Sequence, residues 1–122
     1  PAAHAARAAW PLLLVLHGGG EMGSDPRQLL EVGATGLPVN RLAQPAHPGA
    51  DDARSLPRSL AEDFVVVSPQ ARAGWRAPAL AALTRSLLTQ GQLRLDPCHL
   101  YVTGVSLGGA GALAAASTGL FA

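Results

Sequence analysis

Residues 99–111 read His-Leu-Tyr-Val-Thr-Gly-Val-Ser-Leu-Gly-Gly-Ala-Gly. Apolar, β-branched and aromatic residues precede Ser106, and an Ala-rich stretch follows it. The pattern Gly104-x-Ser106-x-Gly108 therefore lies where a strand turns sharply into a helix, which is the context of a nucleophile elbow. Such a turn strains the serine backbone and exposes its hydroxyl. Side chains at the two glycine positions would collide with the neighbouring strand and helix.

The rest of the chain alternates between strand-like and helix-like segments. With 122 residues it is long enough for one domain with a modest core. Three apolar runs have the length and composition of strands buried on both faces; they are residues 11–16, 64–68 and 100–105. Helical patterns follow these runs at residues 25–33, 78–90 and 107–117. This order predicts an α/β fold, with a three-layer αβα arrangement around a parallel sheet.

Local signals mark the ends of the first helix. Asp25 is the expected N-cap, and Pro26 takes the first helical position. Gln28 can complete a capping box, and Gly33 ends the helix.

The remaining segments carry less periodicity. Residues 1–10 are expected to be a leader or an edge segment, and residues 11–122 to form part of a single domain. Residues 36–62 contain several Pro, Gly and Asp residues, which predicts a long surface loop with one helical turn near Ser59.

Composition excludes several classes of protein. The net charge is +1, and no stretch approaches the roughly eighteen unbroken apolar residues of a membrane span. We therefore expect no membrane span and no nucleic-acid partner. The single Cys98 excludes an internal disulfide. It follows an expected turn at Asp96-Pro97 and enters a predicted strand, so we expect a packed and inert thiol.

The elbow has a definite chemical logic. Ser106 would attack a carbonyl carbon, and the amide N–H of Leu107 would face the developing oxyanion. The helix that begins just after Ser106 adds a favourable dipole at the same place.

A second motif, His17-Gly18-Gly19-Gly20-Glu21, comes directly after the first strand. It resembles the oxyanion loop of esterases, whose backbone N–H complements the one after the nucleophile. Glycine lets the backbone approach the substrate oxygen closely. We expect Gly19 to be the donor, with Gly18 as the alternative. His17 is expected to shape the loop by local hydrogen bonding, and Glu21 to brace it.

The same stretch also matches a dinucleotide fingerprint, Gly18-x-Gly20-x-x-Gly23. The context contradicts that interpretation, because the helix is expected to begin at Pro26, after the glycines. Residues 38–43 contain no Asp or Glu to hold a ribose.

The acidic and histidine residues do not have metal-ligand spacing. His4, His47 and His99 are scattered along the chain, and Asp51-Asp52 is typical of a solvated loop pair. We therefore expect neither a metal nor a cofactor.

Several motifs occur together in the order and spacing of one superfamily. They are Leu-His-Gly-Gly-Gly-Glu at 16–21, Gly-Ser-Asp at 23–25, Val-Ser-Pro-Gln at 67–70, Gly-Trp at 74–75 and the elbow region at 95–109. From residue 11 onward the chain resembles the α/β-hydrolases of the predicted peptidase, phospholipase/carboxylesterase and dienelactone-hydrolase-like type. Polyhydroxybutyrate-depolymerase-like esterases are near relatives in the elbow region.

The resemblance implies roles for particular residues. Ser106 would be the nucleophile, with Leu107 and Gly19 supplying the oxyanion hole. Trp75 would either line the acyl or alcohol pocket or anchor its loop by packing, and both alternatives stay open. The implied substrate is a small-molecule ester or thioester.

The chain departs from the family after the elbow. In this fold the triad acid and then the His follow the serine, yet residues 107–122 contain no Asp, Glu or His. Asp96 and His99 are expected at the far end of the strand that leads to Ser106. The chain is therefore expected to be the N-terminal part of an α/β-hydrolase, truncated after the elbow helix.

Two functional hypotheses follow. The first is a serine hydrolase of the carboxylesterase type, whose acid and base lie beyond the chain. The second is a non-catalytic remnant that acts, if at all, as a binding or interaction module. In both cases the strand that carries Ser106 is expected to expose an edge, which favours self-association.

Overall fold

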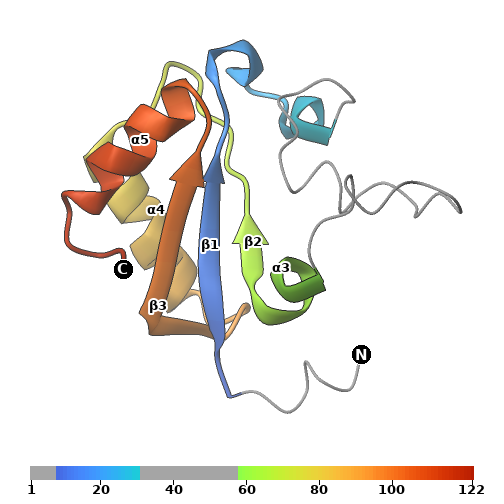
Figure 1. Cartoon of the computed structure of the whole chain (residues 1–122), viewed down its shortest axis with the longest axis vertical. Coiled ribbons are helices and arrows are strands. Elements are labelled where there is room, and N and C mark those ends of the chain that lie inside the picture. The colour runs from blue at the N-terminus through green and yellow to red at the C-terminus, as the bar shows by residue number, and fades with distance from the viewer. Residues whose placement is uncertain (1–7, 31–57) are drawn as a thin grey trace, which may run out of the picture.

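Strand β1 (Trp10–Leu16) is the centre of the structure, a computed structural model that describes residues 8–30 and 58–122. It pairs in parallel with β2 (Val65–Val67) and with β3 (Leu95–Gly104). The strand order is β2-β1-β3, and Figure 1 shows β1 between the two others. The parallel α/β class expected from the sequence is thereby confirmed.

Helices lie against this sheet and around its ends. The helices α4 (Ala77–Thr89) and α5 (Leu107–Ala116) cover one face together (Figure 1). Helix α3 (Arg58–Asp63) contacts β2. Two short 3-10 helices, η1 (Gly19–Glu21) and η2 (Pro26–Leu30), follow β1. The described residues thus show the sheet and one covering helical layer.

The core is built on β1, whose successive side chains point to opposite faces. On the side of α4 and α5 the buried residues are Leu12, Leu14, Leu16, Leu80, Leu100 and Ala115. On the other side, Val15 packs with Leu29 of η2 and with Val66 of β2. Burial on both faces explains why the sequence of β1 is a continuous apolar run.

Strand β3 is longer than the expected strand at 100–105. Trp10 of β1 pairs with Leu95, but Leu12, only two residues later, pairs with Leu100. The extra β3 residues between Leu95 and Leu100 therefore bulge out of the ladder. Within it, Asp96 Oδ1 accepts a hydrogen bond from the Cys98 N–H at 2.9 Å. The expected turn is therefore a bulge inside the strand. Cys98 is exposed because it lies in this bulge, so the expectation of a packed thiol was wrong.

The first predicted helix is the 3-10 helix η2. Asp25 caps it, because its Oδ1 accepts the Arg27 N–H at 3.1 Å. The same carboxylate pairs with the Arg27 guanidinium, and these hydrogen bonds lower the pKa of Asp25 and raise the pKa of Arg27. Gln28 does not complete a capping box, since its Oε1 accepts a hydrogen bond from Gln70 Nε2 at 3.2 Å.

Most of the remaining boundaries agree with the sequence. The helical turn expected near Ser59 is α3, and the last two predicted helices are α4 and α5. Residues 1–7, Gly33 and the expected loop at 36–57 lie outside the described residues. Among the helices of the described part, none has the length and apolar character needed to cross a membrane.

Candidate active site

Ser106 occupies the sharp turn between β3 and α5. Its backbone has φ 53° and ψ −117°, and L-residues other than glycine rarely adopt such a positive φ. Such a conformation costs of order 1–3 kcal/mol and persists only where the surrounding structure holds it. Ser106 O accepts hydrogen bonds from the N–H groups of Gly109 (2.9 Å) and Ala110 (3.2 Å). Ser106 is exposed, so its side chain is open to a ligand.

The two elbow glycines are required by close backbone contacts. A Cβ on Gly104 would lie 2.3 Å from the carbonyl carbon of Gly108. A Cβ on Gly108 would lie 2.1 Å from Leu16 O and 2.7 Å from His17 O. The first turn of α5 therefore sits directly on the end of β1, where the oxyanion-loop motif begins.

The predicted oxyanion donors lie around this contact. Leu107 is the first residue of α5, where the amide N–H has no acceptor within the helix. Gly18 lies against the elbow, because a Cβ on it would be 3.6 Å from Val105 O and 3.8 Å from Ser106 Cβ. Gly19 begins η1, and a Cβ there would meet nothing within 4 Å. Gly18 thus approaches Ser106, and Gly19 is open to a ligand.

His17 is fully buried and holds the glycine loop that follows β1. Its Nδ1–H donates to Gly18 O at 2.7 Å, and its Nε2 accepts from the Ala71 N–H at 2.9 Å. This pair of partners requires the tautomer with the proton on Nδ1. Because both ring nitrogens are engaged, His17 is not available to take a proton from Ser106.

Trp75 also connects the loop after β2 to His17. Its Nε1–H donates to His17 O at 3.0 Å, and the centroids of the indole and imidazole rings lie 4.7 Å apart. A Cβ on Gly111 of α5 would come within 2.6 Å of Trp75 Cβ, so this glycine makes room for the indole. The indole also packs against the main core cluster. This is the arrangement of a packing anchor, and a role in a substrate pocket stays a prediction.

Gln70 is a structural residue of the site that the sequence did not single out. Its Nε2 donates to Glu21 O at 3.0 Å, and the Gly23 N–H donates to Ala71 O at 3.0 Å. The loops after β1 and β2 are therefore joined side by side. The quoted Val-Ser-Pro-Gln run contained the signal, but the partner of Gln70 lies 49 residues away, so its role could not be inferred from spacing.

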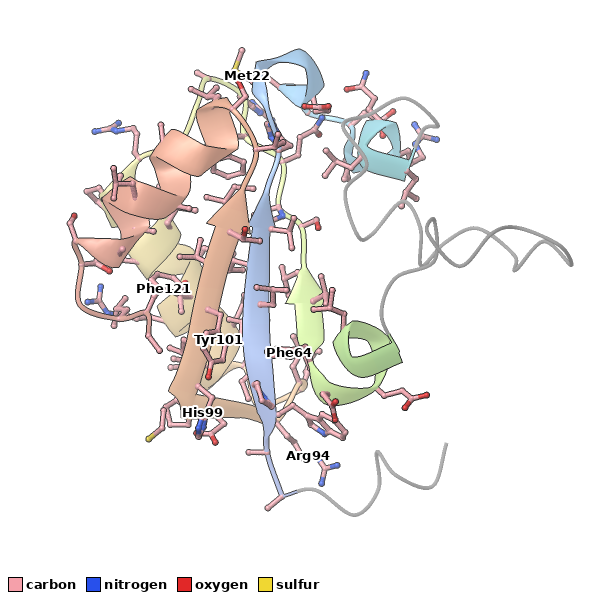
Figure 2. The ribbon with its side chains drawn as sticks, viewed as in Figure 1. Met22, Phe64, Arg94, His99, Tyr101 and Phe121 are labelled. Carbon is pink, nitrogen blue, oxygen red and sulfur yellow. The ribbon has the colours of Figure 1, made fainter. Side chains whose placement is uncertain are left out.

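Asp96 and His99 lie at the start of β3, the end opposite to the elbow, and Figure 2 shows His99 there. His99 Nδ1 and Asp96 Oδ2 are 2.7 Å apart. The hydrogen bond from the Cys98 N–H, and then the one with His99, hold the pKa of Asp96 below its ordinary value. This pair is not part of the site around Ser106.

The metal-ligating residue types of the described part are scattered. Within residues 8–30 and 58–122, no group of three or more His, Cys, Asp or Glu side chains could hold a metal ion. The glycines that match a dinucleotide fingerprint lie in and around the 3-10 helix η1 rather than at the start of an α-helix. His4, His47 and the Asp51-Asp52 pair lie outside the described residues.

No family model, curated protein or solved structure matches the chain. What the geometry brings together is a strained exposed serine, a helix N-terminus and a glycine loop held by His17.

Replacing Gly108 with Ala should destabilise the protein by about 3 kcal/mol or more, because the new methyl would overlap the backbone of β1. Gly109→Ala is the matched control in the same helical turn. Its Cβ would lie 3.4 Å from Gly104 O, so its effect should stay below about 1 kcal/mol. Urea unfolding measures both free energies. Equal values for the two variants would contradict the close contact.

His17→Phe keeps an aromatic ring but removes both hydrogen bonds of the imidazole. We expect a loss of about 1–3 kcal/mol in the free energy of unfolding, because the Ala71 N–H loses its acceptor. The control is His99→Phe at the opposite, exposed end of β3, where about 0–1 kcal/mol is expected. A loss at position 17 no larger than at position 99 would show that the imidazole does not hold the loop.

Proposed function

We propose that the chain carries the nucleophile and the oxyanion hole of a serine hydrolase, of the carboxylesterase type and of α/β-hydrolase fold. The observation that carries the proposal is the backbone of Ser106, with φ 53° and ψ −117°. It is held between two glycines at the carboxyl edge of a parallel sheet. Ligands of open parallel sheets bind at that edge.

The chemistry would proceed through an acyl-serine. Ser106 Oγ attacks the carbonyl carbon of an ester or thioester, and a general base takes the hydroxyl proton. The N–H groups of Leu107 and of Gly19 or Gly18 stabilise the oxyanion. The carbon–oxygen or carbon–sulfur bond then breaks, and the alcohol or thiol leaves with the proton. Water, activated by the same base, cleaves the acyl-serine and releases the acid.

The general base and its acid partner are proposed to come from sequence after Ala122. Two observations support this: both nitrogens of His17 are occupied, and His99 lies at the opposite end of β3. In this fold the acid and then the His follow the serine. The coding sequence past Ala122 is therefore expected to encode an Asp or Glu and later a His.

Covalent labelling tests the proposal directly. A fluorophosphonate should modify the full-length gene product on Ser106, and Ser106→Ala should abolish the mass shift. The matched control is Ser117→Ala, an exposed serine at the end of α5, which should still be labelled. Without a base, the oxyanion hole and binding contribute only on the order of 10³-fold over water in serine proteases.

A stop codon after Ala122, together with no labelling of Ser106, would contradict the hydrolase proposal. That result would favour the alternative, a non-catalytic remnant that acts as a binding module.

A further inference from the structure

Glu21 is a buried acidic residue with an unusual position. It is 8% exposed and is the last residue of η1, directly after the glycines of the oxyanion loop. Taking a carboxylate out of water costs several kcal/mol. A glutamate at the surface of this loop would avoid that cost, so its burial needs a structural reason.

The carboxylate folds back onto Gly18. A Cβ on Gly18 would lie 3.3 Å from Glu21 Oε2 and 3.8 Å from Ser106 Cβ. The glutamate carboxylate and the elbow therefore both border the face of Gly18 from which a side chain would project. A side chain at position 18 would need the space that the carboxylate fills.

The backbone of Glu21 is fixed from two directions. Its N–H donates to Gly18 O at 3.3 Å, and its carbonyl accepts from Gln70 Nε2 at 3.0 Å. The side chain therefore projects from a held backbone. A shift of Gly18 relative to Ser106 would change its contact with this carboxylate.

We propose that Glu21 is a positioning residue, whose carboxylate fills the space beside Gly18 and the elbow and so sets the position of the second oxyanion donor relative to Ser106. The inference rests on the proposed function. A displacement of about 1 Å in such a donor lowers a rate by up to roughly 10²-fold, and loss of one donor costs about 10²–10³-fold.

The shape and the charge of the Glu21 side chain would have opposite effects on the rate. A negative charge beside a developing oxyanion raises its energy, so the charge itself does not assist the reaction. Glu21→Gln keeps the size and planarity of the group, and Glu21→Ala removes it. If the group acts by position, the glutamine variant retains most of the rate or exceeds it, and the alanine variant does not.

The kinetic test measures phosphonate labelling of Ser106 in the full-length gene product, separated into reversible binding (KI) and the chemical step (kinact). Glu21→Ala should lower kinact about ten-fold or more with KI within about two-fold. Glu21→Gln should restore most of kinact. Glu62→Ala, an exposed glutamate of α3, is the matched control and should leave both constants unchanged.

A second measurement does not depend on reactivity. Amide resonances and hydrogen exchange of Gly18, Gly19 and Ser106, followed by NMR, should change in Glu21→Ala and return toward wild type in Glu21→Gln. Unchanged amides together with an unchanged kinact in Glu21→Ala would overturn the inference. A wild-type protein that is never labelled, but whose Gly18 and Ser106 amides respond to Glu21→Ala, would overturn the proposed function and support the placement.

Discussion

The structure depends on the close approach of α5 to the end of β1. Gly108 sits where any side chain would overlap Leu16 O, so the elbow helix starts directly on the central strand. That contact places Ser106 beside the loop that leaves β1, and it fixes which residues can surround this serine. The hydrogen bond from the Val105 N–H to Leu16 O, at 3.3 Å, extends the β1–β3 ladder into the turn. The strained serine is thus held by backbone on both sides.

His17 extends this constraint to the loop after β2. Its imidazole accepts the Ala71 N–H, and its own carbonyl accepts the Trp75 indole N–H, so the loop after β2 is fixed to the end of β1. Breaking either hydrogen bond would leave a buried polar group without a partner, at a cost of about 1–3 kcal/mol. The loop at residues 17–21 is therefore held by hydrogen bonds at its first residue. If its amides are the proposed oxyanion donors, they need no rearrangement as negative charge develops.

The parts of this account that follow from local sequence were predictable. The apolar run of β1 reflects burial on both faces, and the glycine spacing around Ser106 reflects a tight turn between strand and helix. Both β1 and the turn into α5 formed as expected. The bulge that exposes Cys98 was missed, because its cause is the side chain of Asp96 bonding two residues ahead within a strand. The hydrogen bond from the Ala71 N–H to His17 could not be predicted either, since the two residues are 54 positions apart in the sequence. Such contacts come from the three-dimensional fold and not from periodicity.

The central claim is that the elbow and the glycine loop together form an oxyanion hole. A crystal structure of the full-length protein with a phosphonate bound to Ser106 measures this most directly. The account predicts the phosphoryl oxygen within about 2.7–3.1 Å of the Leu107 nitrogen and of the nitrogen of Gly18 or Gly19. A phosphoryl oxygen that points to solvent, with neither loop amide in reach, would contradict the claim.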